Sequence, residues 1–208
     1  SGTLNSILYA DLGAVTVFER NQAGADNWGA VKSFSQPTIG ASGSPLFGTS
    51  VELDGDVLAV GAPEETALSL PGTAVKGRVK IFERNAGGAE NWGQVRSFQG
   101  ADNGTDERFG ASVALQGDTV LVGAPSEDVD GVFRSGAVYV HRRNQGGADN
   151  WGRAARLTQP EVKGDSLFGQ AVALDGDDAV VGAPREDRGL SPNVGAVYFF
   201  ARGRSEVD

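Results

Sequence analysis

One polar, glycine-rich stretch of ten residues occurs three times in the chain: RNQAGADNWG from Arg20, RNAGGAENWG from Arg84 and RNQGGADNWG from Arg143. Three further markers recur in step with it. These are Phe-Gly at Phe47, Phe109 and Phe168, Gly-Ala-Pro from Gly61, Gly123 and Gly182, and Gly-x-Val from Gly13, Gly77, Gly136 and Gly195. Four markers in a fixed order, at a common period of about sixty residues, indicate copies of one structural unit.

Each unit is predicted to form four short strands. In residues 109–115 apolar and small residues alternate, as in a strand, and the following Gln-Gly-Asp supplies the glycine of a tight hairpin turn. Residues 119–125 form the second strand and end in Pro, and residues 136–143 form the third. The repeated decapeptide is then the hairpin that leads to a fourth strand such as residues 93–99, with its Trp buried at the start of that strand.

Four antiparallel strands per unit predict an all-β fold of β-propeller blades, about three blades per chain. A single sheet exposes an apolar face, and stacking blades around an axis covers it. Phe47, Phe109 and Phe168 are expected to wedge between neighbouring blades. Gly61, Gly123 and Gly182 are expected to let backbones approach closely near the axis.

The Phe-Gly and Gly-Ala-Pro pairs, as in FGASVALQGDTVLVGAP at residues 109–125, resemble the FG-GAP repeat. This repeat is the blade unit of the integrin α-subunit propeller and of many bacterial exported proteins. The resemblance implies a propeller fold, and it also implies calcium loops between the first two strands in some relatives. Here only a short turn around Asp54 and Asp56 occupies that place, too short to wrap a calcium ion, so those sites do not carry over.

The repeats predict one domain over residues 1–208, with blade parts at residues 13–36, 47–99, 109–158 and 168–202. Both ends fall inside a blade, so the ring is incomplete within one chain and strand edges stay open. We therefore expect self-association as a closed dimer or a head-to-tail filament, or completion by the remainder of a longer propeller. In each case residues 13–20 and 195–202 compete for the place of one third strand.

Composition narrows the function classes. The formal net charge of −9 disfavours nucleic-acid binding, and no apolar run has the length of a membrane span. No Cys is present, and the single His, His141, stands where other units have Phe, which indicates packing rather than catalysis. We expect no enzymatic activity and no cofactor. The chain begins at Ser1 without an initiator Met, which suggests processing, and we expect an extracellular or cell-surface location.

The loops between second and third strands vary while the strands do not, which is typical of recognition loops on a fixed scaffold. Candidate ligand-binding residues in two of them are Glu127, Asp128, Asp130, Phe133, Arg185, Glu186, Asp187 and Arg188. The simpler interpretation is that their acids are solvated. Calcium is a further candidate, with Asp102, Asp106 and Glu107 as its candidate ligands.

The primary hypothesis is a non-enzymatic binding or structural module that joins other chains through incomplete blades and binds protein through its loops. The alternative is a propeller lectin that stacks sugars on repeated Asn-Trp pairs: Asn27 and Trp28, Asn91 and Trp92, Asn150 and Trp151. Exposed Trp side chains would favour the lectin, and buried ones would not.

Overall fold

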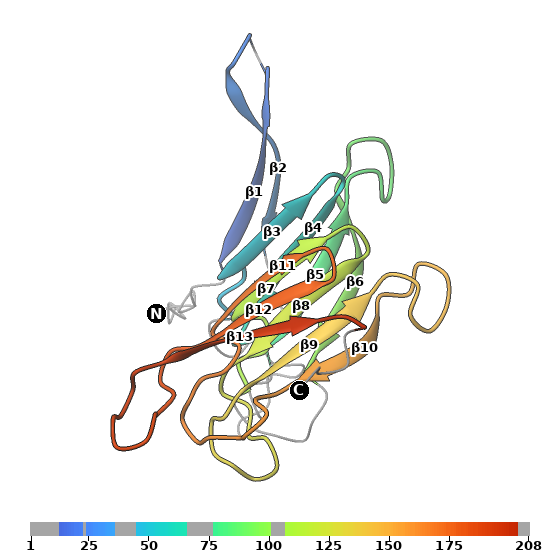
Figure 1. The fold of residues 1–208 in the computed structure, drawn as a ribbon. Helices are drawn as coiled ribbons and strands as arrows, with labels where there is room; N and C mark the ends of the chain where they lie inside the picture. Colours follow the sequence, from blue (N-terminus) through green and yellow to red (C-terminus); the bar gives the residue numbers. More distant parts are fainter. Residues whose placement is uncertain (1–12, 23, 36–44, 66–76, 101–106, 204–208) are drawn as a thin grey trace, which may run out of the picture.

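The structure of the chain is a computed structural model that describes residues 13–22, 24–35, 45–65, 77–100 and 107–203. These residues form thirteen strands and no helix (Figure 1). The strands are β1 (Ala14–Arg20), β2 (Trp28–Ser35), β3 (Ser50–Asp54), β4 (Val57–Ala62), β5 (Arg78–Glu83), β6 (Gly93–Gln99), β7 (Ser112–Gln116), β8 (Thr119–Ala124), β9 (Ala137–Arg142), β10 (Gly152–Leu157), β11 (Ala171–Asp175), β12 (Asp178–Ala183) and β13 (Ala196–Ala201).

The strands make four antiparallel sheets, each in chain order. The first sheet is β1-β2, the second β3-β4-β5-β6, the third β7-β8-β9-β10 and the fourth β11-β12-β13. The prediction of an all-β fold of four-stranded blades is confirmed. The sheets do not close into a ring over the described residues.

Local sequence explains the two kinds of hairpin. The first and second strands of a blade are joined by a two-residue turn in which Gly55, Gly117 and Gly176 adopt φ of 56°, 54° and 59°. The third and fourth strands of each complete blade contain a register shift, as between Ile81 and Phe82. The same shift occurs in the first sheet, between Val17 and Phe18. A bulge at a constant position fixes the register of these hairpins.

Neighbouring sheets pack face to face, with β3, β7 and β11 side by side. Each junction holds one apolar cluster, and Phe47, Phe109 and Phe168 are buried in the three clusters in turn. Their predicted role as wedges is confirmed. The strand expected from Phe109 begins only at Ser112, because Phe109 turns into the core and Gly110 has φ of 90°.

Backbones approach closely at two of the three predicted glycines. A Cβ on Gly61 would lie 2.1 Å from the Gly110 carbonyl oxygen, and one on Gly123 would lie 2.0 Å from that of Gly169. At Gly182 the nearest atom to such a Cβ is 3.6 Å away, in its own sheet. The difference arises because the described residues place no sheet beyond the fourth.

His141 is a packing residue, as predicted. It is buried, and its ring stacks on Phe98 of the second sheet with the centroids 4.2 Å apart. Burial lowers the pKa of His141 to about 4, so the ring is neutral near pH 7.

Candidate binding site: two open blade faces

The outer face of the fourth sheet exposes apolar residues that are buried elsewhere in the array. Val197 and Phe199 on β13 are 59% and 79% exposed. Val79 and Ile81, at the same repeat positions on β5, are 0% exposed because the third sheet covers them. The outer face of the fourth sheet is therefore apolar like a face that is buried between two sheets, but no described sheet covers it.

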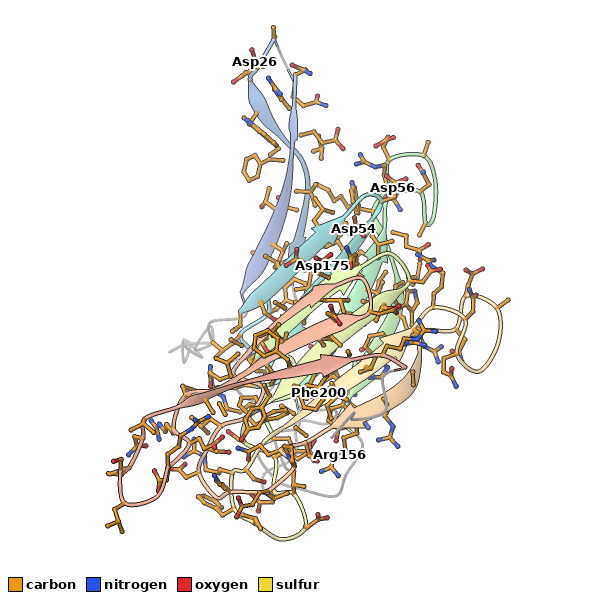
Figure 2. All side chains as sticks on the ribbon, viewed as in Figure 1. Asp26, Asp54, Asp56, Arg156, Asp175 and Phe200 are labelled. Carbon is orange, nitrogen blue, oxygen red and sulfur yellow. The ribbon has the colours of Figure 1, made fainter. Side chains whose placement is uncertain are left out.

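The first sheet, at the opposite end of the series of four sheets, also exposes residues that are buried in the next sheet. Trp28 is 64% exposed and Phe18 is also exposed, whereas Trp92 and Phe82, their counterparts in the second sheet, are buried. The β1–β2 hairpin extends away from the other sheets, with Asp26 at its tip (Figure 2). Its inner side, including Val15, packs on the second sheet, so the exposed residues lie on the opposite side.

The complete junctions share one arrangement of Trp, Arg and Glu. The guanidinium of Arg84 lies 4.8 Å from the centre of the Trp92 ring and bonds Glu19 of the preceding sheet. Arg143 repeats this arrangement over Trp151, also at 4.8 Å, and bonds Glu83. A cation over a buried indole, paired with a carboxylate across the junction, joins neighbouring blades specifically.

Pairing with carboxylates also raises the pKa of the arginine in this arrangement. Hydrogen bonds to Asp56, then Glu90, then Glu19 raise the pKa of Arg84 above its ordinary value. The guanidinium is therefore a fixed cation. In the fourth sheet the counterpart of Arg84 is Arg202, whose side chain is 60% exposed and whose described ion pair is with Asp177.

The junction of the third and fourth sheets contains a cavity of about 400 Å³. Its apolar walls are Leu121, Val140 and Leu157 from one sheet and Leu174, Ala179 and Phe200 from the other. Three charged residues, Arg142, Asp177 and Arg202, also line it. Figure 2 shows Phe200 on β13.

The cavity has a filled counterpart one unit earlier. Ala59, Ile81, Phe98, Leu115 and Val120 stand at the repeat positions of Leu121, Val140, Leu157, Leu174 and Ala179, and they belong to the cluster that encloses Trp151. The described part of the fourth sheet has no fourth strand and no Trp. The cavity thus occupies the position of that indole.

Two acids predicted to bind ligand in the loops are instead buried. Glu127 is 1% exposed and forms an ion pair with Arg156 of β10. Glu186 is 2% exposed and accepts hydrogen bonds from Gln159, at 2.9 Å, and from Tyr198. Burial of these two acids argues against direct contact with a ligand, because cations and donors from neighbouring strands and connections enclose them.

The other predicted loop residues lie at the surface. Asp128 accepts the backbone N–H of Arg134 at 2.8 Å, and Asp187 accepts that of Asn193 at 2.7 Å. Asp130, Phe133, Arg185 and Arg188 are exposed or nearly so. These loops project at one end of the sheets, and most of the corresponding loop after β4 lies outside the described residues.

The repeated Asn-Trp pairs do not form repeated sugar platforms. Trp92 and Trp151 are each 1% exposed, so neither indole face can stack on a ligand, and Asn91 and Asn150 hydrogen-bond hairpin carbonyls. Trp28, beside the exposed Asn27, is the one accessible Trp. This burial removes the basis of the lectin alternative, which required equivalent sites.

Of the calcium candidates, Asp102 and Asp106 lie outside the described residues. Glu107 is fully buried, with its carboxylate against Gly100, where a Cβ would be 1.8 Å from Oε2. In the part of the chain that the structure describes, no three His, Cys, Asp or Glu side chains are grouped to hold a metal ion. A helix able to cross a membrane is also absent from the described residues.

Sequence reasoning did not identify the cavity or the special position of Trp28. A signal was present, since the printed sequence contains four third-type strands but three copies of the decapeptide with its Trp. Strand counting predicted an open edge at this point, but burial at each repeat position was needed to locate the vacant site.

Comparison with known proteins agrees with this architecture. The family model described as the FG-GAP repeat matches residues 92–141 and 151–200. Each match begins at a buried Trp and runs through a fourth strand and then the first three strands of the next blade. No curated protein matched the chain. The chain therefore carries two recognised FG-GAP repeats, and its four antiparallel sheets are consistent with the β-propeller blades of that family.

Proposed function

We propose that the chain is a non-enzymatic, extracellular binding module that assembles with other chains through its incomplete blades. The observation that carries the proposal is the exposure of Val197 and Phe199 at positions where Val79 and Ile81 are fully buried. Covering each of the two exposed side chains contributes about 1.5–3 kcal/mol. Among the described residues β13 is an edge strand, and a further strand would satisfy the backbone groups on that edge.

Two further observations support a binding role without catalysis. The single His is buried and its pKa is lowered by that burial, which is unsuitable for acid–base work near neutral pH. The accessible loop residues combine acids such as Asp128 and Asp187 with the exposed Phe133. This mixture suits contact with a basic or amphipathic protein surface. The extracellular location rests on the resemblance to exported FG-GAP proteins.

Light scattering after size-exclusion chromatography tests the assembly. We expect the purified chain to be larger than a monomer at tens of micromolar, and Phe199→Asp to shift it toward the monomer. Leu190→Asp is the matched control, because Leu190 is fully exposed in the loop between β12 and β13 and is not part of a strand. The proposal fails if the unmodified chain is a monomer throughout, or if the control dissociates the assembly as strongly as Phe199→Asp.

A further inference from the structure

We propose that β2 of a second copy adds to the free edge of β13 and places its Trp28 in the cavity between the third and fourth sheets. This inference rests on the proposed function, because it specifies the partner as another copy of the chain and names the strand that it donates. The cavity is the vacant counterpart of the site that encloses Trp151.

Trp28 and its neighbours fit the site chemically. The chain has three Trp, and Trp28 is the only one that is exposed. Arg202 stands where Arg84 and Arg143 stand, each 4.8 Å from the centre of a Trp ring. Those arginines also pair with an acid of the same decapeptide, Arg84 with Glu90 at 3.1 Å. Asp26 of the second copy offers that acid to Arg202.

In the exchange, β2 leaves β1 of its own chain and joins β13 of the other copy. These two strands resemble each other in sequence. Residues 14–20 read AVTVFER and residues 196–202 read AVYFFAR, so the Ala, Val, Phe and Arg positions coincide. β13 can therefore replace β1 on β2 in the same register, with Val197 and Phe199 in place of Val15 and Val17. An exchange between similar strands is the low-cost route to a dimer known as domain swapping.

The exchange also gives the fourth sheet its missing neighbour, namely the second sheet of the second copy. Where sheets adjoin, a Cβ on Gly77 would lie 2.2 Å from the Phe109 carbonyl, whereas one on Gly195 is 3.1 Å from its nearest atom, which belongs to its own sheet. Likewise Asp54 accepts a hydrogen bond, at 2.6 Å, from the backbone N–H of Gly117 in the β7–β8 turn of the next sheet. Phe47 and Gly55 of the second copy supply the equivalent contacts for Gly195 and Asp175.

Two such exchanges, related by a twofold axis, complete the fourth sheet of both chains and cover its open face, while β1 of each chain is displaced from β2. Each chain then supplies its second and third sheets whole and contributes to two shared blades. The exchange also changes the partners of Arg84, because Ala201 replaces the Glu19 that bonds this arginine. The surrounding acids Asp56 and Glu90 still pair with that arginine.

Engineered disulfides test the exchange directly, because the chain has no Cys. Ala14 and Ser35 are register partners on β1 and β2, so Ala196 of one chain faces Ser35 of the other after exchange. In the test, a chain with Ser35→Cys is mixed with a chain with Ala196→Cys, and the mixture is oxidised. A covalent heterodimer on a non-reducing gel is expected. If the mixture assembles but forms no heterodimer, the exchange is wrong while assembly through blade faces stands.

A reversible lock gives an independent measurement. The Thr16 and Ser33 hydroxyl oxygens are 2.9 Å apart across β1 and β2, so Thr16→Cys with Ser33→Cys joins the two strands of one chain. The oxidised variant is expected to be a monomer and the reduced variant a dimer. Trp28→Ala should weaken the unlocked dimer roughly tenfold to a hundredfold. An oxidised variant that still dimerises, or a Trp28→Ala dimer of unchanged affinity, overturns the proposal.

Discussion

A pair of matched glycine substitutions measures how closely the blades are packed. A Cβ on Gly136 would lie 2.1 Å from the Phe168 carbonyl oxygen of the next sheet, and one on Gly195 would lie 3.1 Å from that of Pro184. Both glycines have positive φ, 82° and 74°, so Ala suffers the same backbone strain of about 1 kcal/mol at either position. Only Gly136→Ala must also move one sheet away from the next.

The additional cost follows from the distance. An oxygen at 2.1 Å must retreat by more than about 1 Å to reach ordinary contact, and overpacking of that kind costs about 1–3 kcal/mol. We expect Gly195→Ala to lower the free energy of unfolding by about 1 kcal/mol and Gly136→Ala by about 3 kcal/mol. Urea unfolding followed by Trp fluorescence measures both.

The comparison is made on a monomer, in the oxidised variant with Cys at positions 16 and 33, because Gly195 would contact Phe47 of a second copy after strand exchange. Equal losses from the two substitutions would refute the close approach of the sheets. In the unlocked chain, Gly195→Ala should also weaken the dimer, since it places a methyl group in the new contact.

Three further outcomes are expected. His141→Phe removes a group whose pKa falls from 6.5 to about 4 on folding. Since the unfolded chain takes up the proton first, wild-type stability should fall by roughly 3 kcal/mol as the pH drops from 6.5 to 4, and the variant should lose less over this range in pH-dependent unfolding. Ala201→Glu restores a carboxylate for Arg84 of the second copy and should lower the dimer dissociation constant in sedimentation analysis. Trp151→Ala should destabilise the locked monomer by about 3–5 kcal/mol in urea, whereas Trp28→Ala should change it by less than about 1 kcal/mol.

The repeat pattern predicted the strands well because their signals are local. The fourth strand expected at residues 93–99 coincides with β6, and the turns at Gly55 and Gly117 lie where Gly follows a strand. Alternation, turn glycines and proline stops act over a few residues, so one sequence is enough to identify them.

Burial could not be predicted in the same way, because it depends on the neighbouring sheet. Near-identical decapeptides leave Trp92 and Trp151 buried and Trp28 exposed. Glu127 was expected to face solvent as a loop acid, yet Arg156 arrives from β10 and pairs with it. In each case the deciding contact comes from a residue far along the chain.

The glycine-to-carbonyl contacts between sheets have a consequence for how such a protein can lengthen. Each contact is made by backbone atoms of one unit with backbone atoms of the next, as at Gly61 and Gly123. A tandem duplication of residues 109–167 would therefore give the new blade suitable neighbours on both sides without any compensating substitution. Such an array can gain whole blades while every junction keeps the same backbone contacts.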